Sequence, residues 1–179
     1  TLVKNSKDQI QQIIKLNGHK VLALCLCESK PSTIYHACEA IEHMASQTDQ
    51  PECTNKLVDN LSIGEGDNVR YYHIPYILLE LALNKKAVEK LYTQASKALD
   101  NIIKYTTNLD ALKLLLDKPN YEGVDDKRYE EVLVKIVRRI NELLSENKTF
   151  KKKLIEDNTL KKLIKLKSIY LIIHYFGDN

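Results

Sequence analysis

The stretch IIKLNGHKVLALCLCESKPSTIYHACEAIEHMA, residues 13–45, alternates apolar segments with short polar turns. Its apolar residues recur at spacings of three and four, which places them on one face of a helix. Gly18 lies in the first turn, and Pro31 with Ser32 opens the last segment, where Ser32 is the expected cap of a helix over 32–46. The stretch therefore predicts successive amphipathic helices that pack on one another.

The first turn has two apparent counterparts further along the chain. The segments KLYTQASKALDNI (90–102) and LIEDNTLKKLIKL (154–166) align with IIKLNGHKVLALC (13–25), with apolar and lysine positions in register. Self-similarity of this kind is typical of helical repeat proteins. We therefore expect a helix, a polar turn and a second helix in each of the three segments.

A second element repeats as well. The segments ACEAIEHMASQ (37–47), IPYILLELALN (74–84) and IVRRINELLSEN (136–147) share apolar residues at helical spacing. They predict helices over 32–46, 67–84 and 128–146, the second with a kink or a split at Pro75. Between the last two, a cap at Thr107 or Asn108 opens a short helix to Leu116, and residues 117–128 form the one long loop.

The composition favours a folded, helical chain without membrane spans. Hydrophobic residues make up 44% and charged residues 28% of the 179 residues, and Gly and Pro are scarce at five and four. No apolar run approaches the roughly 20 residues that cross a bilayer. The net charge of +3 is unevenly distributed, because residues 31–69 hold seven acids and one base, whereas residues 127–167 hold thirteen bases and six acids. The chain begins at Thr1, so we expect a fragment of a longer array in a cytoplasmic protein.

The repeated units resemble armadillo repeats and the related HEAT-like repeats. The motifs AIEHMA (40–45) and ILLELA (77–82) stand where armadillo repeats carry A-L-x-N-L-A. The resemblance implies an all-α fold, a right-handed α-superhelix of three to four irregular repeats that occupies residues 1–179 as a single domain. For function it implies a non-enzymatic scaffold that binds a partner protein or peptide on a concave ridge of helices.

The ridge chemistry departs from that of armadillo proteins that hold extended peptides. Those proteins use an Asn in the motif and a Trp four residues before it, whereas this chain has no Trp and carries charged residues, His43 or Tyr76 at these positions. A nuclear-import receptor is therefore not expected, and charge is expected to select the partner. The predicted partner-binding residues are Glu39, His43, Tyr72, Tyr76, Glu80, Arg138, Arg139 and Glu142.

A basic segment over residues 148–167 offers a second hypothesis. Its lysines flank apolar helical positions, so a solvated helix face is the first interpretation. The alternative is a trafficking module resembling VHS or ENTH domains, in which this surface meets anionic lipid. A third hypothesis is a co-chaperone or exchange factor. Nucleic-acid binding is disfavoured, because arginine is scarce. The basic residues concerned are Lys151, Lys152, Lys153, Lys161, Lys162 and Lys165.

The sequence contains no recognisable motif for catalysis or for metal binding. Cys25 and Cys27 would point about 200° apart on a helix, so they cannot share a zinc ion there. Cys38 and His36 fall on different faces of one predicted helix and make a poor nucleophile and base pair. We therefore predict buried free thiols, no catalytic residue, no metal and no cofactor.

Overall fold

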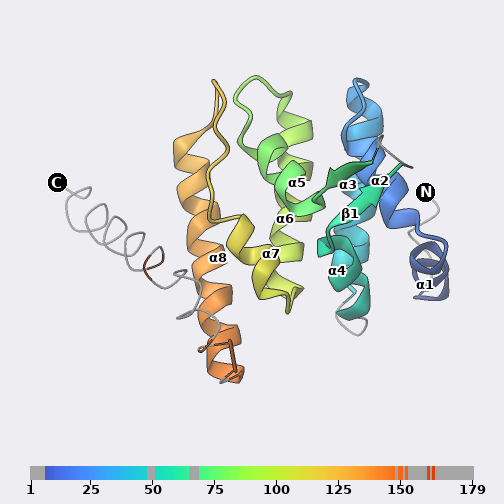
Figure 1. Cartoon of the computed structure of the whole chain (residues 1–179). Coiled ribbons are helices and arrows are strands. Elements are labelled where there is room, and N and C mark those ends of the chain that lie inside the picture. Colours follow the sequence, from blue (N-terminus) through green and yellow to red (C-terminus); the bar gives the residue numbers. More distant parts are fainter. Residues whose placement is uncertain are drawn as a thin grey trace. The chain divides into compact units, whose positions relative to one another are not determined.

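The computed structural model describes residues 7–47, 51–64 and 69–147, together with residues 149, 150, 152, 161 and 163. These residues are mostly helical, with one small two-stranded sheet (Figure 1). The chain divides into two compact units, Thr1–Ile136 and Val137–Asn179. The helices are α1 (Lys7–Lys15), α2 (Gly18–Leu26), α3 (Pro31–Ala45), α4 (Pro51–Val58), α5 (Ile74–Leu83), α6 (Glu89–Tyr105), α7 (Leu109–Leu114) and α8 (Asp126–Glu146).

The helical character of the prediction is confirmed, and several helix ends follow the expected capping chemistry. Asn17 adopts a left-handed conformation at the turn between α1 and α2, a conformation that Asn tolerates better than most residues. Asn108 caps α7, because its side chain accepts hydrogen bonds from the backbone N–H groups of Asp110 and Ala111. α3 begins at Pro31, so Lys30 rather than Ser32 occupies its N-cap position.

The predicted helix over 67–84 is wrong in its first part. Strand β1 (Leu61–Ile63) pairs antiparallel with strand β2 (Arg70–Tyr72), so that Leu61 lies opposite Tyr72. The aromatic residues of β2 favour a strand. α5 starts only at Ile74, which puts Pro75 in its first turn, where a missing N–H costs nothing and no kink arises.

The turn predicted within residues 90–102 is also wrong, because this segment is the middle of the uninterrupted helix α6. Nothing in the segment breaks a helix, whereas the corresponding turn between α1 and α2 holds Asn17 and Gly18. The polar residue Gln94 is buried instead of marking a turn. The third aligned segment, 154–166, lies almost wholly outside the described residues.

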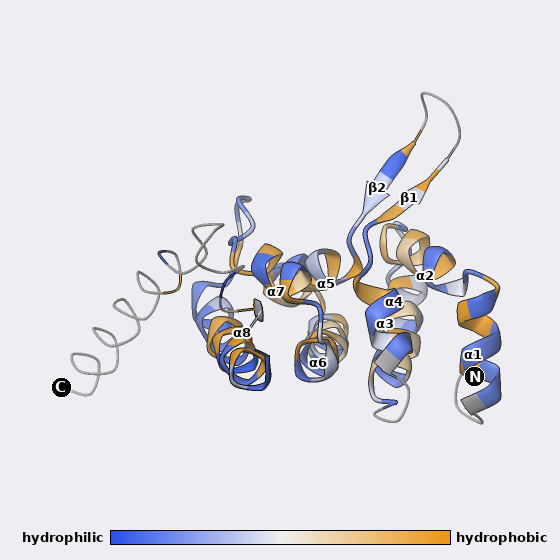
Figure 2. Cartoon of the chain, turned by 60° about the horizontal axis from the view of Figure 1, so that its bottom comes forward, coloured by the Kyte–Doolittle hydropathy of each residue, from blue (hydrophilic) through white to orange (hydrophobic). Residues whose placement is uncertain are grey.

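The helices of the first unit form two layers. α6 packs along α3 and also along α5, and α2 packs on α3. Figure 2 shows α3 and α6 in one layer, with α2, α5 and α7 in the other. Apolar side chains fill the space between the layers; Ile41, Leu78, Leu79, Leu99, Ile102 and Leu112 are among the residues with no more than 1% exposure. The end of α7 and the start of α8 are joined by residues 115–125, so the last residues of the predicted 117–128 loop are helical.

A polar link between α3 and α6 supports a testable prediction. Gln94, which is buried, donates from Nε2 to the Glu42 carboxylate, and Asn101 Nδ2 donates to the Glu42 carbonyl oxygen at 3.3 Å. Replacing Gln94 with leucine leaves the carboxylate without this donor, so we expect a loss of about 1 kcal/mol in the free energy of unfolding. Urea denaturation measures it. Glu42→Gln keeps an acceptor for Gln94 and is expected to cost less than half as much; equal losses would contradict this explanation.

Candidate functional site

The outward face of α3 carries the first group of predicted site residues. Buried apolar residues occupy one side of this helix, and Glu39, His43 and His36 lie on the opposite side. Nδ1 of His36 and Oε2 of Glu39 are 3.4 Å apart. The side chain of His43 is half-buried, and its carbonyl oxygen accepts a hydrogen bond from Ser46 Oγ at 2.8 Å. The predicted residues Glu39 and His43 therefore share one surface.

A lysine stripe runs along the outward face of α6, the helix beside α3. Lys90, Lys97 and Lys104 are exposed and follow one another at intervals of seven residues. Seven residues are nearly two helical turns, so the three side chains lie along one line with a rise of about 10.5 Å between neighbours. The buried residues of α6, such as Leu99 and Ala95, lie on the other side of the helix.

Tyrosine rings rather than carboxylates hold two of these lysines. Lys90 Nζ lies 4.7 Å from the centre of the Tyr35 ring of α3, and Lys104 Nζ lies 4.9 Å from the centre of the Tyr105 ring. A cation–π contact orients an ammonium group without neutralising its charge. Within the described part of the chain, none of the three lysines is ion-paired, and Lys97 makes no hydrogen bond or ring contact. The stripe therefore keeps its positive charge.

Sequence reasoning missed this stripe. The alignment of repeats placed a turn within residues 90–102, which hid the fact that residues 90–104 belong to one helix. The spacing of seven between Lys90, Lys97 and Lys104 is visible in the sequence and is the signal that could have found it.

The first part of α8 contacts α6 beside the lysine stripe. Lys135 Nζ donates to both carboxylate oxygens of Asp100 on α6, at 2.7 and 2.6 Å. The guanidinium carbon of Arg128 lies 3.6 Å from the centre of the Tyr92 ring, and its Nε lies 3.5 Å from the Asp125 carboxylate. The Asp100 carboxylate is therefore occupied by Lys135 and does not compensate the stripe.

Three predicted site residues lie away from this surface. Tyr72 belongs to β2, and Tyr76 and Glu80 belong to α5, which is in the layer opposite α3 and α6 (Figure 2). Burial raises the pKa of Glu80, and the Tyr121 hydroxyl donates to the Glu80 carbonyl oxygen at 2.7 Å. The placement of Tyr76 and Glu80 on a common ridge with Glu39 is thus corrected: α6, not α5, is the neighbour of α3 in that layer.

The remaining predicted residues lie in the second unit. There Arg139 Nη1 donates to Glu142 Oε2 at 3.0 Å, one turn further along α8, and Arg138 is exposed. Lys152 and Lys161 are exposed as well. Lys151, Lys153, Lys162 and Lys165 lie outside the described residues, so the basic-surface hypothesis for them stays a prediction.

The four thiols differ in burial. Cys38 and Cys53 are buried, as predicted, whereas Cys25 is only partly buried and Cys27, which follows the last residue of α2, is exposed. Burial raises the pKa of Cys38 to about 12, so this thiol is protonated at neutral pH and is a poor nucleophile. Among the described residues, no cluster of three or more His, Cys, Asp or Glu is placed to hold a metal ion.

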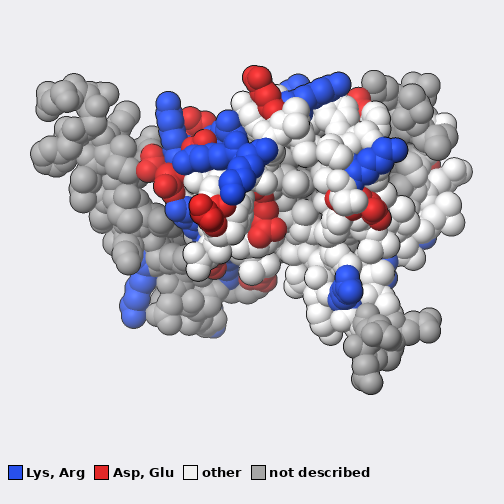
Figure 3. Space-filling view, turned by 90° about the horizontal axis from the view of Figure 1, so that it is seen from above, with Lys and Arg blue, Asp and Glu red and all other residues white. Residues whose placement is uncertain are grey.

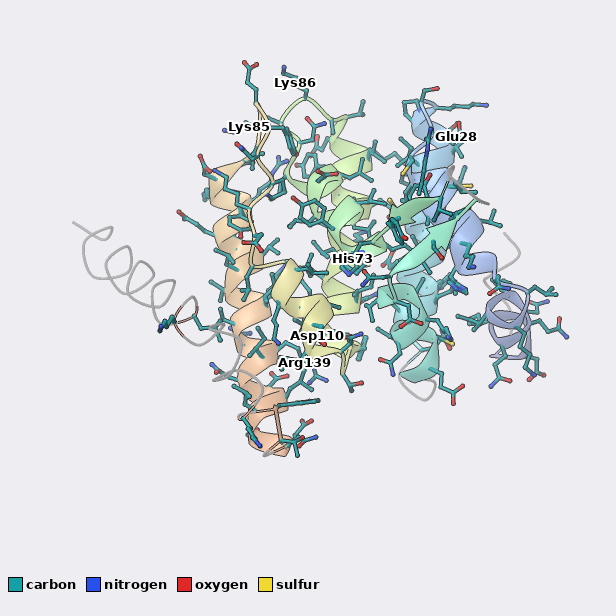
Figure 4. The ribbon with its side chains drawn as sticks, viewed as in Figure 1. Glu28, His73, Lys85, Lys86, Asp110 and Arg139 are labelled. Carbon is teal, nitrogen blue, oxygen red and sulfur yellow. The ribbon has the colours of Figure 1, made fainter. Side chains whose placement is uncertain are left out.

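One end of the first unit is rich in charge of both signs. Lys85 and Lys86 lie in the turn between α5 and α6 (Figure 4), close to the loop that leads into α8. There Lys118 donates to the Asp126 carboxylate and holds its pKa below the usual value. Figure 3 shows basic and acidic side chains intermingled on this end. Because charges of both signs are mixed here, the electrostatic field at this end is less uniform than the field along the lysine stripe.

No helix within the described ranges is long and apolar enough to span a bilayer. No protein-family model and no curated protein matches the chain. An engineered protein of known crystal structure is similar over 80% of this chain, with 18% sequence identity and a TM-score of 0.46. The chain corresponds to only 34% of that protein's length.

Proposed function

We propose that this chain is a non-enzymatic interaction module, an α-superhelix of armadillo or HEAT type that binds a partner protein or peptide. The proposal is supported by successive helix pairs in the first unit, in which α3 and α6 lie side by side as the outer helices of their pairs. Units of this kind bury their apolar faces by stacking and leave a row of outer helices for a partner.

One observation carries the proposal. The outward face of α3 and α6 combines Glu39 and His43 with three lysines whose charge no described carboxylate neutralises. Like charges that lie close together repel one another and lower the stability of the folded chain. A bound partner of opposite charge removes this repulsion and gains affinity and specificity from it. We name this face, defined by Glu39, His43, Lys90, Lys97 and Lys104, the α3–α6 ridge.

A pull-down with quantitative mass spectrometry tests the proposal. We expect the wild-type chain to retain one dominant protein that a ridge variant, His43→Ala with Lys97→Glu, loses. Glu80→Lys is the control, because it reverses a charge on α5 in the other layer. Circular dichroism verifies that each variant is folded. Retention of the same partner by the ridge variant, or its equal loss from Glu80→Lys, would contradict binding at the ridge.

A further inference from the structure

We propose that the α3–α6 ridge takes an acidic peptide segment in an extended, polyproline-II-like conformation, with carboxylates at every third residue. This inference rests on the proposed function and specifies the chemistry of the partner. It starts from the lysine stripe, because Lys90, Lys97 and Lys104 present three positive charges in one line on a single rigid helix.

The spacing of the stripe selects the conformation of the partner. Neighbouring lysines on α6 are separated by a rise of about 10.5 Å. A polyproline II helix has three residues per turn with a rise of about 3.1 Å, so that every third side chain returns to the same face after about 9.3 Å. The four-carbon lysine stem absorbs a difference of about 1 Å per step. In a β-strand, side chains three apart point to opposite faces, so a flat strand fits the stripe less well.

The surroundings of the stripe favour a peptide over other polyanions. The Glu42 carboxylate on α3 accepts from Gln94 of α6 and would repel a continuous phosphate backbone along α6, whereas a peptide with separated acids can leave a gap opposite it. None of the arginines that nucleic-acid recognition favours lies on α6. A partner helix would need apolar side chains on α6 to pack against, and the outward positions of α6 are polar.

Two aromatic contacts prepare the site. Tyr35 and Tyr105 hold the ammonium groups of Lys90 and Lys104 by their ring faces, which reduces the side-chain freedom that binding would otherwise remove. Tyr35 also makes an edge-to-face contact with the His36 ring, with centroids 5.5 Å apart. The outer two lysines are thus oriented before a partner arrives.

The test uses fluorescent synthetic peptides and the full chain. One peptide carries glutamate at every third residue, a second has the same composition with its glutamates adjacent, and a third replaces them with glutamine. We expect the first to bind about fivefold more tightly than the second, to bind more weakly as salt is raised, and the third not to bind. Alanine at Lys90, Lys97 and Lys104 together should weaken the first peptide about tenfold.

The matched control removes three exposed lysines elsewhere. Alanine at Lys15, Lys85 and Lys86 makes the same change in net charge, and the last two lie in the α5–α6 turn (Figure 4). We expect this variant to bind within about twofold of wild type, since exposed charges act over about one Debye length. An equal loss in both variants, or equal binding of the two glutamate peptides, would overturn the inference. So would tighter binding of an oligothymidine or of a helical peptide with glutamate at every seventh residue.

The outcomes separate this inference from the proposed function. If the ridge variant His43→Ala with Lys97→Glu loses a cellular partner while no acidic peptide binds the stripe, the partner chemistry is wrong and the interaction module stands. If the ridge variant loses nothing and no peptide binds, both proposals fail.

Discussion

Replacing Gly18 with alanine is expected to lower the free energy of unfolding by about 2 to 3 kcal/mol. A Cβ atom added at Gly18 would lie 2.4 Å from Ile13 Cγ2 and 2.9 Å from the Ile13 carbonyl oxygen. Neither atom can swing away, because one is a branched methyl group on a helix and the other is backbone. The alanine variant must therefore move α1 away from α2. Urea denaturation followed by circular dichroism measures the loss.

The neighbouring residue provides the control for this experiment. Asn17 has a φ of 57°, so glycine at position 17 fits the turn without strain. Asn17→Gly is expected to change the free energy of unfolding by less than about 1 kcal/mol. If Gly18→Ala proved as harmless as Asn17→Gly, the close approach of α1 to α2 would not be a feature of the folded protein.

The two turns that the sequence predicted well are those where the local chemistry is decisive. Asn17 and Gly18 end one helix and open the next, and Asn108 caps α7 with its own side chain. In both cases the signal lies within a few residues, so no tertiary contact is needed to identify it. The same holds for the C-terminal ends of α3 and α5, which lie within one residue of the ends that apolar spacing predicted.

The parts that were predicted wrongly have two different causes. The turn within residues 90–102 came from aligning this segment with residues 13–25, although nothing in it breaks a helix; in the fold Gln94 is buried in α6 and donates to Glu42 of α3, which is 52 residues away. The hairpin pairs Leu61 with Tyr72 across the connection between its two strands. Its strands have only three residues each, and a run of three residues is too short to show the alternating pattern by which a strand is predicted. As a result, the predicted ridge placed α5 beside α3, where the structure has α6.

That exchange explains the error in the candidate site. Glu39 and His43 were placed on a surface that the structure keeps, since they lie on the outward face of α3. Tyr76 and Glu80 were assigned to the same ridge because α5 was aligned with α3. Two helices that share a pattern of apolar residues can still belong to different layers, because the pattern fixes which face is buried and not which neighbour covers it.

Lowering the pH from 6.5 to 4 is expected to destabilise the chain through His73, by about 2 kcal/mol in addition to other titrations. His73 caps α5, its Nδ1 accepting from the Tyr76 backbone N–H at 3.3 Å, beside the base of the hairpin (Figure 4). Nε2 is buried without a hydrogen-bond partner among the described residues. Burial lowers the pKa of His73 from 6.5 to about 4, and the accepting role of Nδ1 also requires a neutral ring.

His73 binds a proton more readily in the unfolded chain than in the folded chain. Between pH 6.5 and 4 the unfolded chain binds a proton at His73 that the folded chain excludes, so stability is fully present above pH 6.5 and falls as the pH drops. Burial lowers the pKa of His19 as well, which adds to the slope in the same direction. The figure of about 2 kcal/mol is smaller than the full shift from 6.5 to about 4 would give, because the His73 side chain is only partly buried and water solvates the rest.

Urea denaturation at several pH values, with His73→Asn beside the wild type, isolates this contribution. Asparagine keeps an acceptor at the N-cap of α5 but has no titrating ring. The variant is therefore expected to be less stable than wild type at pH 7, where the packing of the ring is lost, and to lose less stability on acidification. Asn108→Ser, which exchanges one non-titrating cap for another at α7, should shift the whole curve without changing its slope. Parallel curves for His73→Asn and wild type would mean that the His73 ring does not resist protonation in the folded chain, and that the hairpin base admits the charge.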